Sequence, residues 1–290
     1  MTETPSQAAR RAGATGPEPV ERSVIDVLRD RLTNSPRSAV EHFDRELNDR
    51  VFMAMLRPIA EHWFRLQVRG VENIPLHGAA LLVGNHSGAI ALDALMTQLA
   101  VFDHHPRHRH VHMLAADFVF DLPVLADIAR AAGHTSASRD EAFHLLERGR
   151  LVGVWPEGLK GLGKTWHKRY ELQHFGRGGF AATAALARVP IIPVAVVGAE
   201  EAYPMLADLA PLAKLLGLPY FPLTPTFPVL GLAGAVPLPS KWLIEFGEPI
   251  PPEALPDPYD ERAVLAFAQE FRLRMQEQVD HLLAERGPAF

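Results

Sequence analysis

The sequence predicts an α/β protein with a mostly parallel central sheet flanked by helices. One pattern along the chain predicts it, and two features of the composition limit the class of protein further. Short apolar runs, typical of buried strands, alternate with segments of helical periodicity. Of the 290 residues 48% are hydrophobic, which is enough for a substantial core. The chain contains no cysteine, so disulfides, zinc–thiolate sites and thiol nucleophiles are excluded.

The domain is expected to begin after a disordered tail. We assign residues 1–35 to this tail, with one short helix around residues 24–32, and residues 36–290 to a single domain. Apolar residues then recur every three or four positions from Val40 to Trp63, which predicts an N-terminal helical segment. Pro58 lies inside this segment and should kink or split the helix, because proline removes a backbone donor.

The rest of the domain alternates between the two periodicities. Strands are expected at residues 66–69, 79–84, 111–115, 151–155, 191–197 and 242–246. Helices are expected at residues 93–101, 125–132, 141–148 and 179–188, and a long C-terminal helix at residues 260–285.

Charge and hydropathy limit the partners. The net charge of −5 argues against nucleic-acid binding, which needs many exposed cations. The first twenty residues contain no apolar run typical of a secretory signal, so we expect a cytoplasmic protein. Residues 215–240 carry no charge but contain six prolines, which disfavour a transmembrane helix. This segment is either a buried loop or an apolar surface that contacts the membrane interface.

A first group of polar residues follows the strand at residues 79–84. Its members are Asn85, His86, Ser87 and Asp93. Ligands of α/β sheets bind at the carboxyl ends of strands, and His86 with Asp93 suggests a general base with an orienting carboxylate. A straight helix would separate the two residues by about 10 Å, so contact requires an irregular turn, which Gly88 permits. The structural alternative is a capping His86 with Asp93 as an N-cap.

A second group follows the strand at residues 151–155. Pro156 stops this strand, and Glu157 and Gly158 open a glycine-rich loop. Between Lys160 and Arg177 the loop carries five basic residues against one acidic residue. Backbone amides at glycines and at a helix N-terminus bind anions, so the loop is either an anion site or a solvated basic loop.

A third group is rich in histidine. It comprises His104, His105, His108, His110 and His112, with Arg107 and Arg109. We interpret it as the loop entering the strand at residues 111–115 and expect no metal there. Contact with anionic lipid headgroups is the alternative.

Four motifs in order make the sequence resemble the glycerolipid acyltransferases of the lysophosphatidic acid acyltransferase type. They are Asn85-His86 with Asp93, Gly133 with Arg139, Trp155-Pro156-Glu157-Gly158, and the apolar stretch Val189 to Val194, which contains Pro190 and Pro193. The likeness covers roughly residues 63–250. Six residues separate His86 from Asp93, where the commonest pattern has four, and this spacing is similar to that of an Asn-His-Ser-Gly subgroup.

The resemblance implies an O-acyltransferase without a covalent intermediate. His86 would deprotonate the acceptor hydroxyl with the support of Asp93, and the fatty acyl donor would be acyl-CoA or an acyl carrier protein. The expected acceptor is a lysophospholipid such as 1-acylglycerol-3-phosphate, or else diacylglycerol or another neutral lipid. No cofactor is expected. A hydrolase of lipid esters or thioesters and a non-catalytic lipid-binding protein are the alternatives.

The resemblance also assigns the binding residues. Substrate contacts are expected from Asn85, Ser87, Arg139, Glu157, Gly158, Lys160 and Arg177. Arg139 would bind the acceptor phosphate, and Glu157 and Gly158 would bind the acceptor backbone or stabilise the site. Because the substrates are amphiphiles, we expect peripheral membrane association through residues 206–238 and the helix near residues 51–59.

Overall fold

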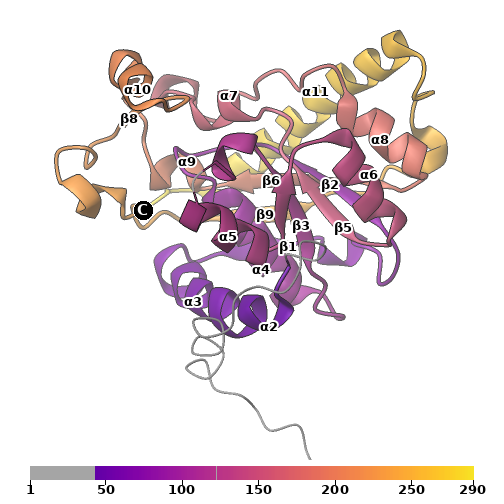
Figure 1. The fold of residues 1–290 in the computed structure, drawn as a ribbon, viewed down its shortest axis with the longest axis horizontal. Coiled ribbons are helices and arrows are strands. Elements are labelled where there is room, and N and C mark those ends of the chain that lie inside the picture. Colours follow the sequence, from indigo (N-terminus) through magenta and orange to yellow (C-terminus); the bar gives the residue numbers. More distant parts are fainter. Residues whose placement is uncertain (1–42, 122) are drawn as a thin grey trace, which may run out of the picture. The chain divides into compact units, whose positions relative to one another are not determined.

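A seven-stranded sheet forms the centre of the computed structural model, which describes residues 43–121 and 123–290 (Figure 1). The strand order is β1-β9-β6-β2-β5-β3-β4. The strands are β1 (Gln67–Arg69), β2 (Ala80–Gly84), β3 (Val111–Ala115), β4 (His134–Ser136), β5 (Leu151–Val154), β6 (Ile191–Val197) and β9 (Leu243–Phe246). The expected tail at residues 1–35, its short helix and the expected helix start at Val40 lie outside the described residues.

Most of the sheet is parallel, as the alternating pattern predicts. The five strands from β6 to β4 run in one direction, whereas β9 is antiparallel to β6 and β1 is parallel to β9. The carboxyl ends of β2, β5 and β6 therefore meet at one edge, with β2 in the middle. Ligands of such sheets bind at this kind of edge.

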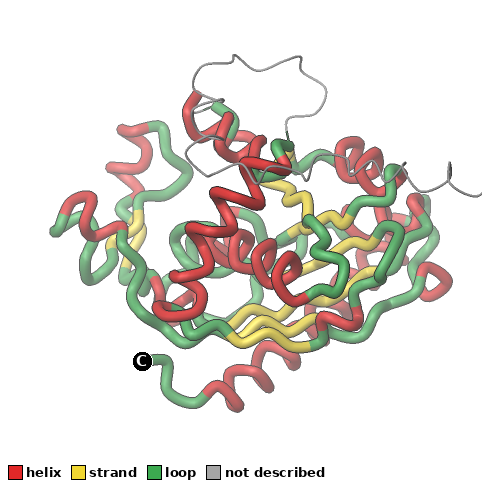
Figure 2. Tube along the Cα trace, turned by 90° about the horizontal axis from the view of Figure 1, so that it is seen from below, coloured by secondary structure: helices red, strands yellow, loops and turns green. Residues whose placement is uncertain are grey.

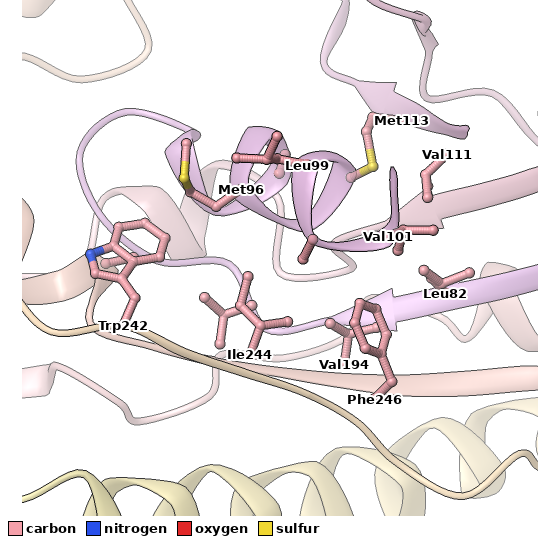
Figure 3. Close-up of a cluster of buried hydrophobic side chains, with 14 of the residues drawn as sticks. Leu82, Met96, Leu99, Val101, Val111, Met113, Val194, Trp242, Ile244 and Phe246 are labelled. Atoms are coloured by element: carbon pink, nitrogen blue, oxygen red, sulfur yellow. The ribbon is translucent and has the colours of Figure 1, made fainter. Parts of the chain in front are cut away.

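Helices cover both faces of the sheet. They are α4 (Leu92–His104), α5 (Pro123–Ala131), α6 (Arg139–Glu147), α8 (Gly179–Ala187) and α11 (Glu261–Arg286). Leu81 and Val83 of β2 pack in one core cluster with residues of α6, α8 and α11. Leu82, between them, belongs to the core cluster on the opposite face, which also contains Met96, Leu99 and Val101 of α4 (Figure 3). This alternation accounts for a strand that is buried throughout.

The N-terminal helical segment changes its hydrogen-bond pattern along its length. It consists of α2 (Arg45–Leu47), the π-helical η1 (Asn48–Phe52), α3 (Met53–Pro58) and the π-helical η2 (Ile59–Trp63). Pro58 ends α3, so the predicted disruption occurs there as a change from α to π geometry. Met53 faces the core, whereas Met55 is 66% exposed.

Residues 206–238, which include most of the proline-rich segment, form an excursion that lies apart from the main sheet (Figure 2). It contains β7 (Ala207–Asp208), α10 (Ala210–Leu216), β8 (Pro222–Leu223) and the 3₁₀ helix η6 (Gly231–Ala235), with β7 and β8 antiparallel. The expected alternative of a buried loop is wrong, because Leu215 and Val229 are 80% and 79% exposed. Within the described residues, no helix combines the length and apolar character needed to cross a bilayer.

Short elements complete the chain, and the sequence did not predict them. They are α7 (Leu159–Leu162), α9 (Ala199–Ala202) and the 3₁₀ turns η3 (Val71–Asn73), η4 (Asp117–Val119), η5 (Trp166–Lys168) and η7 (Pro252–Ala254). Strand β4 was missed as well. It has three residues, His134-Thr135-Ser136, and no apolar pattern, and the sheet edge is where such a strand is tolerated.

Candidate active site

A histidine–aspartate pair lies at the carboxyl end of β2. Nδ1 of His86 is 2.7 Å from Oδ2 of Asp93, and the Asp93 side chain has no exposed surface. The ionised carboxylate can only accept, so Nδ1 carries the proton and neutral His86 has its lone pair on Nε2. The pair therefore has the arrangement of a general base with an orienting carboxylate.

An irregular turn makes this contact. Gly88 adopts a φ of +83°, and a Cβ at this position would be 2.9 Å from the carbonyl oxygen of Ala199. Helix α4 starts only at Leu92, with Ala91 as its N-cap, so the alternative of Asp93 as the N-cap is wrong. Asp93 instead accepts hydrogen bonds from His86 and from the backbone amides of Ser87 and Ala94.

Two neighbours of His86 are buried. Asn85 donates to the carbonyl of Val196 and accepts from its amide, at 2.9 and 2.7 Å, so it ties β2 to β6. Ser87 is fully buried, and its Oγ has no hydrogen-bond partner among the described residues. It makes no hydrogen bond with the His86 ring, so it lacks the contact that a serine nucleophile needs.

Glu157 binds the His86 backbone from the end of β5. Its Oε1 accepts from the His86 amide at 2.8 Å, and its Oε2 accepts from the Gln173 amide at 2.7 Å. Its side chain is completely buried. Of the two expected roles, this geometry matches stabilisation of the site. Gly158, with a φ of +55°, makes the turn after Glu157.

A buried lysine forms ion pairs with Glu157 and with Glu200. Nζ of Lys164 lies 3.5 Å from Oε2 of Glu157 and 2.9 Å from Oε1 of Glu200. Burial alone would lower the pKa of Lys164, but the charges of Glu200 and Glu157 outweigh it and raise this pKa. Burial raises the pKa of Glu200, and Lys164 offsets part of that rise. Lys164 is therefore unavailable to a ligand, although its loop was expected to bind anions.

Arg139 begins helix α6 and lies against the start of α8. Its Nε would be 3.0 Å from a Cβ placed on Gly179, so the guanidinium packs on the first turn of α8. The first amides of a helix lack internal partners and favour anions. Arg139 is exposed, as are the other two expected cations, Lys160 and Arg177. An anion at this position would meet the guanidinium and the helix terminus together.

The apolar excursion reaches the loop that carries His86. The Tyr220 hydroxyl donates to the Ala89 carbonyl at 2.6 Å, and burial raises the pKa of Tyr220 to about 12. Ile90 next to this contact is 45% exposed, and Leu159 after Gly158 is 37% exposed. Exposed apolar side chains therefore lie on both loops of the site.

The histidine-rich group does not converge on one point. His105 contacts the carbonyl of Ile74, His108 that of Phe102, and His110 the carboxylate of Asp49. His112 lines a separate cavity of about 520 Å³, and burial lowers its pKa to about 4. Within residues 43–121 and 123–290, no set of three or more acidic or histidine side chains is arranged to hold a metal ion.

Sequence reasoning missed three supporting residues. The sequence presents Lys164 as one of several loop cations, and it carries no signal for Glu200, whose contact with Lys164 depends on β6 and β5 lying on either side of β2. Gly161 was read as part of an anion-binding loop, but its role is steric. A Cβ there would be 2.7 Å from Cβ of His86, so only glycine fits beneath the histidine.

Comparison with known proteins finds a family model and several proteins that are similar in sequence. The family model described as Acyltransferase matches residues 65–197. An uncharacterized protein of Mycobacterium tuberculosis is 48% identical over 270 residues, 92% of this chain and 75% of that protein. The bovine DGAT1/2-independent enzyme synthesizing storage lipids is 29% identical over 98 residues, 34% of this chain and 28% of that protein.

One solved structure has a similar fold. The 1-acyl-sn-glycerophosphate (LPA) acyltransferase PlsC of Thermotoga maritima matches with a TM-score of 0.52. The sequence identity is 20%, and the match covers 82% of this chain and 83% of that one. At this identity the likeness establishes the α/β fold.

Proposed function

Because the chain belongs to the acyltransferase family, we propose that it is an O-acyltransferase acting on a glycerolipid hydroxyl. The acyl donor in this proposal is acyl-CoA or an acyl carrier protein, and the first candidate acceptor is a lysophospholipid such as 1-acylglycerol-3-phosphate. The observation that carries it is the contact of 2.7 Å between His86 Nδ1 and a fully buried Asp93.

The proposed reaction is a direct transfer. Nε2 of His86 removes the proton of the acceptor hydroxyl as its oxygen attacks the thioester carbonyl, and Asp93 stabilises the resulting imidazolium. The C–S bond of the thioester breaks, and His86 returns the proton to the leaving thiolate. The products are an ester and a free thiol. Ser87 makes no hydrogen bond with the His86 ring, which favours direct transfer over a serine acyl-enzyme.

A phosphate-bearing acceptor suits the three exposed cations of the expected binding set. The guanidinium of Arg139 can bind two phosphate oxygens, and the first amides of α8 add a positive potential. Lys160, in α7, and Arg177, just before α8, are exposed. We therefore assign Arg139 to the acceptor phosphate, with Arg177 and Lys160 as additional contacts.

An apolar approach surface suits lipid substrates. Leu206, Leu215, Val229 and Leu230 of the excursion are at least half exposed, and Tyr220 links the excursion to the His86 loop. Trp63 of η2 donates to the Pro237 carbonyl, so the exposed side of η2 lies next to the excursion. We propose that these two segments contact the membrane surface and hold the enzyme there as a peripheral protein.

A neutral acceptor such as diacylglycerol is the second candidate. The similarity over 98 residues to the bovine enzyme synthesizing storage lipids favours it. A neutral acceptor has no phosphate for Arg139 to bind, so Arg139→Ala separates the two candidates. The variant should raise KM for a phosphate-bearing acceptor and leave that for diacylglycerol unchanged.

The test is an acyl-transfer assay with purified protein, labelled acyl-CoA and acyl carrier protein, and a panel of lysophospholipid and neutral acceptors. Products are identified by mass spectrometry. His86→Ala should abolish transfer, whereas the matched control His281→Ala, on the exposed side of α11, should not. Near-normal turnover of His86→Ala would exclude the general-base assignment. Release of free fatty acid without acyl transfer would indicate a hydrolase, and no turnover with any acceptor would favour a lipid-binding protein.

A further inference from the structure

A second cationic site lies outside the candidate active site. It is a cavity of about 260 Å³ lined by seven arginine and histidine side chains. The arginines are Arg45, Arg107, Arg109 and Arg150. Among the residues that the structure describes, no aspartate or glutamate lines the cavity. In a protein with a net charge of −5, such a concentration of one sign requires an explanation.

The cavity lies at the amino edge of the sheet. Its walls come from the residues just before β2, β3 and β5, among them His77, His110 and Arg150. His86 follows the other end of β2, a strand of five residues. At about 3.3 Å per residue, the strand separates the two sites by roughly 16 Å. The cavity is therefore distinct from the candidate active site.

Arg109 forms a fixed positive wall. Its guanidinium donates to the carbonyls of Pro75, Gly78 and Gly149, which hold the three entering loops together. Burial lowers the pKa of Arg109, and the nearby charge of Arg150 lowers it further. Carbonyl contacts neutralise no charge, so the positive potential of Arg109 remains available to an anion.

The other arginines are exposed at the mouth. No carboxylate in the described part of the chain forms a salt bridge with Arg45, Arg107 or Arg150. Their guanidinium groups can therefore turn towards a shared ligand without breaking an existing ion pair. Arg107 and Arg150 come from different loops, before β3 and β5, so a ligand can be bound from two sides.

The histidines add donors. Nδ1 of His108 donates to the Phe102 carbonyl at 2.7 Å, and the residue has a φ of +45°, an unusual conformation for a residue other than glycine. Nε2 of His110 lies 2.6 Å from Oδ1 of Asp49, so an acidic group contacts this histidine. His77 completes the set.

We propose that this cavity binds a phosphate-bearing anion at a site separate from the acyl-transfer site. Guanidinium groups bind phosphate oxygens in pairs, and several of them around one cavity suit a doubly charged group better than a single carboxylate. The volume holds a phosphate with a small substituent, such as glycerol phosphate. Two sources carry this chemistry: an anionic lipid headgroup at a membrane, and a soluble phosphomonoester.

The test compares binding by the full chain and by three variants. Arg107→Gln/Arg150→Gln removes two exposed cations of the cavity and leaves Arg109 to hold the loops. Arg262→Gln/Arg274→Gln on α11 makes the same change in charge elsewhere, and Arg139→Gln removes the candidate acceptor contact. Inorganic phosphate and glycerol 3-phosphate are titrated by calorimetry. Phosphatidylcholine vesicles, with and without phosphatidic acid, are tested by flotation.

The expected result is a loss of affinity of about tenfold or more in Arg107→Gln/Arg150→Gln, with the other two variants close to wild type. If the loss affects soluble phosphates, the ligand is a phosphomonoester. If the double variant loses only the additional vesicle binding that phosphatidic acid causes, the ligand is an anionic lipid headgroup. Equal binding by Arg107→Gln/Arg150→Gln and wild type, or loss only in Arg139→Gln, would overturn the proposal. These readouts do not depend on acyl-transfer activity.

Discussion

Replacing Lys164 with methionine should destabilise the protein and weaken the candidate site. The ammonium group of Lys164 lies between the carboxylates of Glu157 and Glu200, and the lysine side chain is 1% exposed. Methionine fills a similar volume without charge. The substitution therefore leaves two buried carboxylates without their cation, while Glu157 keeps the amides of His86 and Gln173.

The magnitude follows from the two distances. At an effective dielectric constant of about 20, a separation of 2.9 Å gives an attraction of about 6 kcal/mol, and 3.5 Å gives about 5 kcal/mol. The variant no longer buries the ammonium, which returns several kcal/mol of desolvation energy. The net loss should be about 3–5 kcal/mol of unfolding free energy, which corresponds to a fall in Tm of roughly 6–20 °C.

The loss of unfolding free energy in Lys164→Met should depend on pH. Burial raises the pKa of Glu200 in the folded protein, and removing Lys164 should raise it further. A carboxyl group with a raised folded pKa favours the folded state as pH falls, because the folded state binds its proton more readily. The deficit of Lys164→Met should therefore shrink as pH falls from 7 towards 4.5, the usual glutamate value.

Urea unfolding followed by circular dichroism measures both effects. Lys164→Met/Glu200→Gln is the internal control, since it removes one of the two unbalanced charges and should recover part of the loss at pH 7. Acyl transfer by folded Lys164→Met at low temperature should also fall, because Glu157 positions the His86 backbone. An unfolding free energy within 1 kcal/mol of wild type at pH 7, with no dependence on pH, would refute the reasoning.

Three further outcomes test the site and its surroundings. Asp93→Asn should lower kcat by roughly 10³-fold with little change in KM, because the amide cannot stabilise a charged His86. Gly161→Ala should lower kcat by about 10²-fold, since its Cβ would displace the His86 backbone (2.7 Å from Cβ, 2.8 Å from O). Leu215→Ser/Val229→Ser removes two apolar side chains that are 80% and 79% exposed, and should weaken liposome binding in flotation without lowering Tm.

Each of these variants has a matched control. Asp127→Asn changes a carboxylate that is 86% exposed, and Gly163→Ala places a Cβ near only one atom, the Leu159 carbonyl oxygen at 3.2 Å. Leu273→Ser removes an exposed leucine from α11, away from the excursion. If a control variant loses as much kcat or liposome binding as the variant it is matched to, the explanation given for that residue is wrong.

The order of strands and helices was readable from the sequence because hydrophobic periodicity records burial directly. Strand β3 occupies the predicted residues 111–115, and the C-terminal helix differs from its expected bounds by one residue at each end. The Leu-Leu-Val run of β2 is continuous because both of its faces are buried. The edge strand β4 carries no comparable pattern, since an edge needs little burial. The strand β9 lies within the predicted residues 242–246, but its antiparallel direction leaves no periodic trace in the sequence.

The sequence by itself determined the fold class, because hydrophobic periodicity records burial along the whole chain, and it proposed the pair His86 and Asp93, because the two residues are close in the chain. The structure decided between this pair and the capping alternative. Only the tertiary structure decided which residues support the pair. Glu157 reaches His86 because β5 lies beside β2, and Lys164 joins Glu157 to Glu200, which follows β6 on the other side of β2. Whether a lysine binds a ligand or forms a buried ion pair depends on burial and nearby charges, and both arise from segments distant in sequence.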